Sequence, residues 1–208
     1  MFREEAVWVE KALQKIKPLP ANKQAANLGA STAVFRQQVQ PHIHSHVVQP
    51  LIDAGWQVLH IDIKKEDGVD LIADVTEDSF AERFENRFGL TVCTNMLEHV
   101  QDIAKVAGNI FKATMHGGYI LITVPYKYKK HLDPIDNMFR PAPGEIAMLF
   151  RKGTAEIIDS KIIIIKDKAY YTIKKSRFPF WGYREVIGYY LGRYHKVSGI
   201  LLKINKER

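Results

Sequence analysis

A glycine turn and an acidic residue, each at the end of an apolar segment, are the residues of this chain best suited to hold a ligand. The turn reads Asn27-Leu28-Gly29-Ala30-Ser31, and some thirty residues later comes Val58-Leu59-His60-Ile61-Asp62. Glycine lets the backbone approach a ligand without an intervening Cβ, and a carboxylate can accept hydrogen bonds from two hydroxyls. The pairing is typical of open α/β sheets that bind an adenosine-bearing cofactor.

Short apolar segments alternate with helical patterns along most of the chain. The predicted strands are 23–28, 57–61, 68–74, 90–94, 119–124, 157–165 and 169–174, with a further helix and strand within 182–206. The predicted helices are 2–16, 32–54 with breaks at Pro41 and Pro50, 78–88, 96–115 closed by Gly117-Gly118, and 143–152. This alternation predicts an α/β fold, a Rossmann-like doubly wound, mostly parallel seven-stranded sheet with helices on both faces.

Polar residues follow the predicted strands in order, at the edge where open α/β sheets bind their ligands. They are Gly29 and Ser31, then Asp62, Asp74 and Asn95, and last Pro125 and Tyr126. Each strand of a purely structural sheet also ends in polar residues. The ordered set, however, predicts one ligand crevice.

With these residues the chain resembles the class I S-adenosylmethionine-dependent methyltransferases, in particular the small bacterial ubiquinone-biosynthesis type. The resemblance covers roughly residues 23–150. The motifs that carry it are Asn27-Leu28-Gly29-Ala30-Ser31, His60-Ile61-Asp62, Ala73-Asp74-Val75-Thr76, Cys93-Thr94-Asn95-Met96-Leu97-Glu98-His99-Val100, and Gly117-Gly118-Tyr119 through Val124-Pro125. The later segments His131-Leu132-Asp133-Pro134 and Met138-Phe139-Arg140-Pro141 are similar to a loop found in many relatives.

The resemblance implies S-adenosylmethionine as the cofactor and a role for each matching residue. Asn27, Gly29, Ala30 and Ser31 would line its methionine part. Asp62 with Ile63 would hold the ribose, Asp74 with Val75 would meet the adenine, and Asn95 with Met96 would form the floor near the sulfonium. Asn27 stands where the family has an acid, and Ser31 and Ala33 stand where it has glycines.

Methyl transfer to a hydroxyl needs a group that takes up the acceptor's proton. His131, Asp133 and His99 are the predicted catalytic residues, because they would face the crevice and histidine titrates in the useful range. Glu98 and His99 alone are too few ligands for a magnesium site, so no metal is expected there. His42, His44 and His46 lie in the predicted connection between two strands. We expect them to be exposed to solvent and not to bind a metal, because side chains two positions apart on a helix point in different directions.

The amino-acid composition is that of an ordinary globular protein. The basic residues are concentrated toward the end of the chain. The net charge is +7, and residues 161–208 hold twelve Lys or Arg against three Asp or Glu. We expect a single methyltransferase-like domain over 1–208, with a capping helix at 1–20, a cofactor-binding core at 23–152 and a basic, aromatic-rich segment at 153–208. The lone Cys93 excludes an intramolecular disulfide, and a cytoplasmic location is expected.

The predicted function is methyl transfer to a small-molecule or sugar-like acceptor. The alternative is a catalytically degenerate fold that serves as a binding module or associates with membrane or RNA. Aromatic residues interleave with the basic ones in 161–208, which suits an anionic membrane surface or a phosphorylated ligand. Nucleic acid is an unlikely partner because no recognition domain is appended, and a homo-oligomer is compatible with the same surface.

Overall fold

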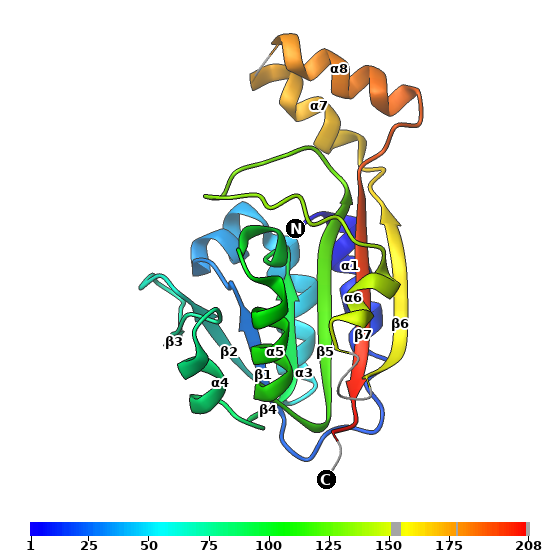
Figure 1. Ribbon diagram of the computed structural model, residues 1–208. Helices are drawn as coiled ribbons and strands as arrows, with labels where there is room; N and C mark the ends of the chain where they lie inside the picture. The colour runs from blue at the N-terminus through cyan, green and yellow to red at the C-terminus, as the bar shows by residue number, and fades with distance from the viewer. Residues whose placement is uncertain (151–154, 178, 207–208) are drawn as a thin grey trace.

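Seven strands form one sheet in the computed structural model, which describes residues 1–150, 155–177 and 179–206, without the side chains of 173–182. The order is β3-β2-β1-β4-β5-β7-β6 (Figure 1). The strands are β1 (Gln24–Leu28), β2 (Gln57–Asp62), β3 (Leu71–Ile72), β4 (Phe88–Thr94), β5 (Thr114–Lys127), β6 (Ala155–Ile164) and β7 (Lys196–Ile204). Strands β1 to β5 pair in parallel, and β7 runs antiparallel to β5 and β6. The predicted fold class is confirmed.

Helices cover both faces of this sheet (Figure 1). The helices of one face are α1 (Arg3–Leu13) and α3 (Gln49–Asp53), and those of the other are α4 (Asp78–Arg83), α5 (Ile103–Ala113) and α6 (Pro143–Met148). Each face has its own cluster of buried apolar side chains. Strands β4 and β5 are buried almost throughout, as expected for parallel strands covered on both sides.

Helix α1 packs closely on the antiparallel part of the sheet through Trp8. A Cβ added at Gly199 of β7 would lie 2.4 Å from Cζ3 of the Trp8 ring, so only glycine leaves room for it. This contact places the first residues of the chain beside the carboxyl ends of the parallel strands.

The segment between β1 and β2 is helical with interruptions, as predicted. It contains the short helix α2 (Pro41–Ile43) between two π-helical turns, Phe35–Val39 and His44–Val48. Pro41 and Pro50 each occupy the first turn of a helix, where a missing N–H costs nothing.

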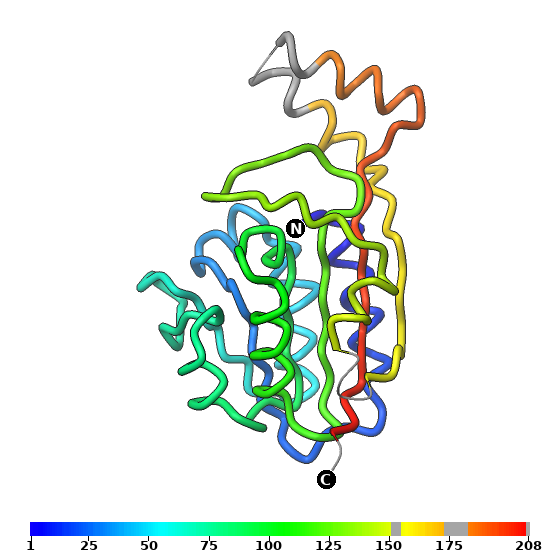
Figure 2. The backbone as a smooth tube through the Cα atoms, viewed as in Figure 1, coloured from blue at the N-terminus to red at the C-terminus, as the bar shows by residue number. Residues whose placement is uncertain are grey.

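A helical hairpin, α7 (Lys168–Arg177) and α8 (Pro179–Tyr190), projects beyond the carboxyl ends of the parallel strands (Figure 2). The predicted strand at 169–174 is therefore wrong. Asp167 explains the difference, because its carboxylate accepts a hydrogen bond of 2.9 Å from the amide of Ala169 and so caps the start of a helix. The basic segment 161–208 also contains aromatic residues. Among these, Phe178 and the side chains of Phe180 and Trp181 lie outside the described residues.

The predicted helix over 96–115 is divided and ends early. A 3-10 turn, Leu97–His99, comes first, and α5 begins after Asp102, whose carboxylate accepts a hydrogen bond of 2.9 Å from the amide of Lys105. Gly117-Gly118 lies inside β5 and does not close the helix. For the last predicted helix, 143–152, the structure gives α6, and residues 151 and 152 lie outside the described part.

None of the helices in the described residues is both long and apolar enough to cross a membrane.

Candidate functional site

The turn after β1 takes a left-handed backbone conformation at two positions. Gly29 has φ 63° and Ser31 has φ 57°, a region that glycine enters freely and other residues rarely adopt. A Cβ added at Gly29 would lie 3.3 Å from both Cγ and Sδ of Met96. The glycine thus lets the turn lie against the segment that follows β4.

Asp62, at the end of β2, holds this turn. Its Oδ2 accepts a hydrogen bond of 2.9 Å from the amide of Ser31, and its Oδ1 accepts one of 3.1 Å from the amide of Lys64. Each carboxylate oxygen can accept a second hydrogen bond. Asp62 could therefore still accept from ribose hydroxyls, although it also has a structural role.

Arg36, in the π-helical turn Phe35–Val39, supports the turn after β1, and the sequence did not reveal this role. It is only 4% exposed, and its guanidinium donates hydrogen bonds to three carbonyl oxygens, those of Ala30 at 2.8 Å, Ser31 at 2.6 Å and Gly68 at 2.8 Å. In the sequence it is one basic residue in the predicted helical segment 32–54, and nothing there signals a buried contact.

Asn27 is buried at the end of β1 and pairs with His60 on β2. Its Nδ2 lies 3.1 Å from Nδ1 of His60 and donates to it when the imidazole is neutral. Burial, assisted by the positive charge of Arg36, lowers the pKa of His60 to about 4, which keeps the ring neutral at physiological pH. This pairing leaves the side-chain carbonyl oxygen of Asn27 as an acceptor.

A cavity of about 1210 Å³ lies beyond the carboxyl ends of β1, β4 and β5. The start of α1, the loop after β5 and the base of the helical hairpin enclose it (Figure 1). Eight predicted site residues line it: Asn27, Gly29, Ala30, Ser31, Asn95, His99, His131 and Asp133. At this size the cavity could hold the methionine end of a cofactor and a small acceptor together.

Five other predicted site residues do not line this cavity: Asp62, Ile63, Asp74, Val75 and Met96. The carboxylate of Asp74 accepts hydrogen bonds of 2.8 and 2.7 Å from the amide and hydroxyl of Thr76. Ile63 is 60% exposed. The structure brings the predicted catalytic residues and most predicted methionine-side residues into one cavity, and it places Met96 and the predicted adenosine-side residues outside its walls.

Glu5 links helix α1 to the ends of β4 and β5, beside the cavity. The sequence alone did not identify it as a site residue. It is fully buried, and its Oε1 accepts hydrogen bonds of 2.7 Å from Nδ2 of Asn95 and 2.5 Å from the hydroxyl of Thr123. Its Oε2 accepts one of 3.0 Å from the amide of Phe2. The two donors from Asn95 and Thr123 hold α1 against the ends of β4 and β5, and the Phe2 amide ties the same carboxylate to the start of its own helix.

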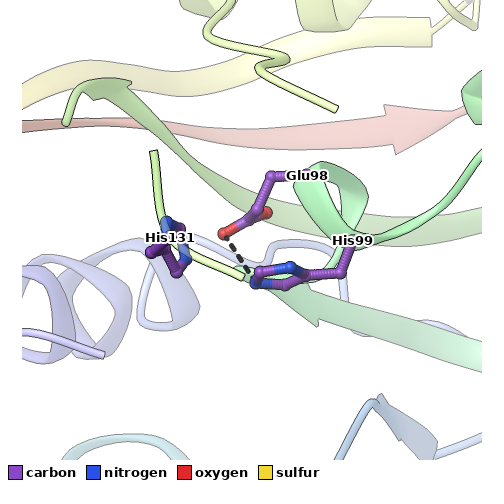
Figure 3. A group of neighbouring side chains, drawn as sticks. All are labelled: Glu98, His99 and His131. Atoms are coloured by element: carbon purple, nitrogen blue, oxygen red, sulfur yellow. Dashed lines mark ion pairs between the residues drawn. The ribbon is translucent and has the colours of Figure 1, made fainter. Parts of the chain in front are cut away.

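Glu98, His99 and His131 gather at the same wall of the cavity, as Figure 3 shows. Glu98 is fully buried, and neither of its oxygens has a hydrogen-bond partner among the described residues. Nε2 of His99 lies 3.8 Å from Oε1 of Glu98. Burial raises the pKa of Glu98 to about 8, and the negative charge of Glu5 adds to that effect.

The two histidines of this cluster differ in how their rings are held. Nδ1 of His99 lies 2.6 Å from the carbonyl oxygen of Ile135, whereas Nδ1 of His131 lies 3.2 Å from Oδ2 of Asp136 without forming a hydrogen bond. Their rings meet edge to face, with centroids 4.9 Å apart. Burial lowers the pKa of the His131 imidazole, so the neutral ring is favoured.

Asp136 organises the loop that carries His131. Its carboxylate accepts hydrogen bonds from Nη2 of Arg140 at 2.6 Å and from the amides of His131 and Met138 at 2.8 Å. Burial would raise the pKa of Asp136, but these hydrogen bonds outweigh it and hold the pKa well below its usual range. The loop therefore presents His131 in a fixed place, whereas Asp133 is exposed on it.

The histidines of 42–46 contact separate partners. Nε2 of His42 lies 3.0 Å from the carbonyl oxygen of Met1, and Nδ1 of His46 lies 2.7 Å from Oε2 of Glu10.

No family model and no curated protein matches the sequence. Solved structures do match the fold. A proposed sarcosine dimethylglycine methyltransferase from Galdieria sulphuraria aligns with a TM-score of 0.62 and 14% identity, over 96% of this chain and 84% of that one. The [4+2]-cyclase SpnF aligns at 0.59 and 10% identity, over 97% and 81% of the two chains.

A phosphoethanolamine N-methyltransferase 2 from Haemonchus contortus, solved with phosphomonomethylethanolamine and S-adenosylhomocysteine, aligns at 0.54 and 15% identity. The alignment covers 98% of this chain and 53% of that one. The chain shares the fold of these proteins. Since one of them is a cyclase, the fold by itself does not fix the reaction.

Proposed function

We propose that this protein transfers the methyl group of S-adenosylmethionine to a small-molecule acceptor. The observation that carries the proposal is the cavity at the carboxyl ends of β1, β4 and β5, which Gly29 and Asn27 line on one side and His99 and His131 on the other. Methyltransferase structures with this fold support the assignment of the cofactor.

The residues present fit the methionine end of this cofactor. Gly29 and Ser31 turn the backbone away from the space beyond β1, and Asn27 offers a carbonyl oxygen to an ammonium group. Asp62 keeps acceptor capacity for ribose hydroxyls. The cofactor, when bound, supplies a methyl group on a positively charged sulfur. The part of the protein is then to align the acceptor with it and to exclude water.

His99 and His131 are the groups placed to take a proton from a hydroxyl acceptor. When Nδ1 of His99 donates to the carbonyl of Ile135, its Nε2 is left as an acceptor. The lowered pKa keeps the His131 ring neutral and able to accept a proton. Asp133, on the same loop, lies at the cavity and would contact the acceptor rather than the cofactor.

Isothermal titration of the full chain with S-adenosylhomocysteine and S-adenosylmethionine tests the proposal. We expect one site with a dissociation constant in the micromolar range. The absence of binding heat at millimolar ligand, at several temperatures, would refute it and would favour a protein that keeps the fold only to bind a partner.

A second surface supports delivery of the acceptor from an anionic membrane. Tyr183 and Ile187 of α8, and Leu191 directly after it, recur at every fourth position and are 52%, 56% and 62% exposed. Lys168, Arg184 and Arg193 are exposed around them. An apolar stripe bordered by basic residues is the pattern of a helix that lies on anionic lipid.

Vesicle flotation tests this surface. The protein should float with vesicles that contain phosphatidylglycerol and not with phosphatidylcholine alone, and Ile187→Ser with Leu191→Ser should reduce flotation several-fold. Ile157→Ser, at an exposed position of β6, is the control. Binding to RNA in place of vesicles, or self-association through the same residues, would contradict it.

A further inference from the structure

The cluster of Glu98, His99 and His131 has the composition of a metal site. Each residue offers one ligand atom, and these atoms all lie within 4.8 Å of one another. Two of the residues come from the 3-10 turn after β4 and the third from the loop after β5 (Figure 3). Residues thirty positions apart are thus held around one point.

Glu98 is the least ordinary member of the cluster. Its side chain is completely buried, and both carboxylate oxygens lack a hydrogen-bond partner among the described residues. Buried polar groups are nearly always hydrogen-bonded, because an unpaired one loses its interaction with water without replacement. A cation between Glu98 and the histidines would supply the missing interaction.

His99 is oriented as a metal ligand usually is. A ligating histidine commonly turns its other nitrogen toward a carbonyl or carboxylate oxygen, which fixes the ring and the tautomer. Nδ1 of His99 lies 2.6 Å from the carbonyl oxygen of Ile135, and its Nε2 faces Glu98. Nδ1 of His131 is buried and has no hydrogen-bond partner among the described residues, so a cation would satisfy an unpaired atom here as well.

We propose that Glu98, His99 and His131 bind a divalent transition-metal cation such as Zn²⁺ or Mn²⁺. Two imidazoles and one carboxylate suit transition metals better than Mg²⁺ or Ca²⁺, which prefer oxygen ligands. Around one tetrahedral ion these ligand atoms would lie about 3.4 Å apart, so small side-chain rotations close the site. The remaining coordination positions face the cavity, where an oxygen atom of an acceptor or a water could enter.

From the sequence we expected no metal here, because Glu98 and His99 alone provide too few ligands. The proposed site adds a third ligand. The missing third ligand, His131, follows these two residues by more than thirty positions, and only the folded loop brings it to them. In the metal-bound protein, His99 and His131 would be ligands, and the acceptor would be polarised by the cation.

Isothermal titration of the full chain, first treated with EDTA, with ZnCl₂ and separately with MnCl₂ tests the site in the absence of any cofactor. We expect one metal per chain for at least one of the two ions, with micromolar or tighter affinity. His131→Ala and Glu98→Gln should each weaken it at least tenfold. His44→Ala is the matched control and should leave it unchanged.

Cobalt supplies a second readout. Co²⁺ bound by two histidines and a carboxylate should give a visible absorption band that is lost in His99→Ala and His131→Ala, with circular dichroism used to confirm that each variant is folded. If a variant fails to fold, His131→Gln takes its place. No binding of either metal at millimolar concentration, or affinity that falls with His44→Ala and not with His131→Ala, would overturn the proposal. Neither result alters the separate titration with S-adenosylhomocysteine.

Discussion

The two halves of the ligand edge differ in how they are built. On the side of β1, β4 and β5, the start of α1, the loop after β5 and the helical hairpin border a cavity, and the buried carboxyl groups of Glu98 and Glu5 line or support it. On the side of β2 and β3, the edge is open, and β3 has only two residues. There Asp62 accepts hydrogen bonds from the amides of Ser31 and Lys64, and Asp74 accepts one from the amide of Thr76.

This difference indicates where binding free energy and catalysis reside. We expect the half with the cavity to fix the reacting groups, because hydrogen bonds and packing hold its side chains in place. The open half should add affinity through fewer contacts. Variants in the two halves therefore have different expected effects.

Glu5→Ala should have the largest effect, and it acts on stability. It would leave the donors of Asn95, Thr123 and Phe2 without their acceptor in a buried place, and each such donor costs about 1–3 kcal/mol. We expect the free energy of unfolding to fall by about 3 kcal/mol or more, measured by urea denaturation. Glu82→Ala, at an exposed position, should change it by less than about 0.5 kcal/mol. If the two variants changed the free energy of unfolding equally, Glu5 would not hold α1 to the sheet as described.

Gly29→Val should disrupt the half with the cavity next. Its φ of 63° disfavours a β-branched residue, and its Cβ would press on Met96. We expect affinity for S-adenosylhomocysteine to fall about 100-fold, roughly 2.7 kcal/mol. Gly144→Ala, where a Cβ meets no atom within 4 Å, is the control for titration calorimetry. Unchanged affinity in Gly29→Val would place the cofactor elsewhere.

A comparison of Asp62→Ala with Asp74→Ala sharpens the description of the open half. Asp62 borders the first turn and can reach a ribose, so its loss should weaken S-adenosylhomocysteine binding about tenfold, roughly 1.4 kcal/mol. The carboxylate of Asp74 accepts hydrogen bonds from Thr76. Asp74→Ala should therefore weaken binding of S-adenosylhomocysteine by less than tenfold. A larger effect at Asp74 would show that the adenine end dominates recognition.

The parallel part of the sheet was predictable from the sequence. Apolar segments that end in polar residues predicted a mostly parallel sheet with Gly29, Ser31 and Asn95 at its strand ends, and the structure places these residues along the cavity. The prediction failed at 169–174, because the β-branched and aromatic residues there favour a strand, whereas Asp167 caps a helix and Tyr171 is buried against Ile165 and His195.

The missed residues depend on contacts that join distant parts of the chain. Glu5 meets Asn95 and Thr123 across about ninety or more positions, and Arg36 reaches Gly68 across thirty-two. His131, which lies near Glu98, comes from a loop whose conformation Asp136 sets. No local periodicity reports such contacts, so only the folded structure identifies them.

A smaller effect is expected from pH, through His60. Its pKa is lowered to about 4 in the folded protein and is about 6.5 when unfolded, so the unfolded chain binds the proton first as pH falls. Stability should therefore decline between about pH 6.5 and pH 4, by about 1 kcal/mol or more from this group. Below that range His60 adds no further loss.

The variant His60→Gln isolates this contribution, because glutamine can still accept from Asn27 but does not titrate. The difference in unfolding free energy between the wild type and this variant should change across pH 6.5 to 4. His116→Gln, at an exposed histidine, serves as the comparison. A pH dependence identical in the wild type and in His60→Gln would assign the effect to another group.

A crystal structure of the protein with S-adenosylhomocysteine tests the central claim most directly. The account predicts that the amino-acid end of the ligand lies in the cavity beyond β1, against Gly29 and within hydrogen-bond distance of Asn27, and that its sulfur faces the wall of His99 and His131. Ligand density outside this cavity, or an amino-acid end directed away from Asn27 toward solvent, would contradict it.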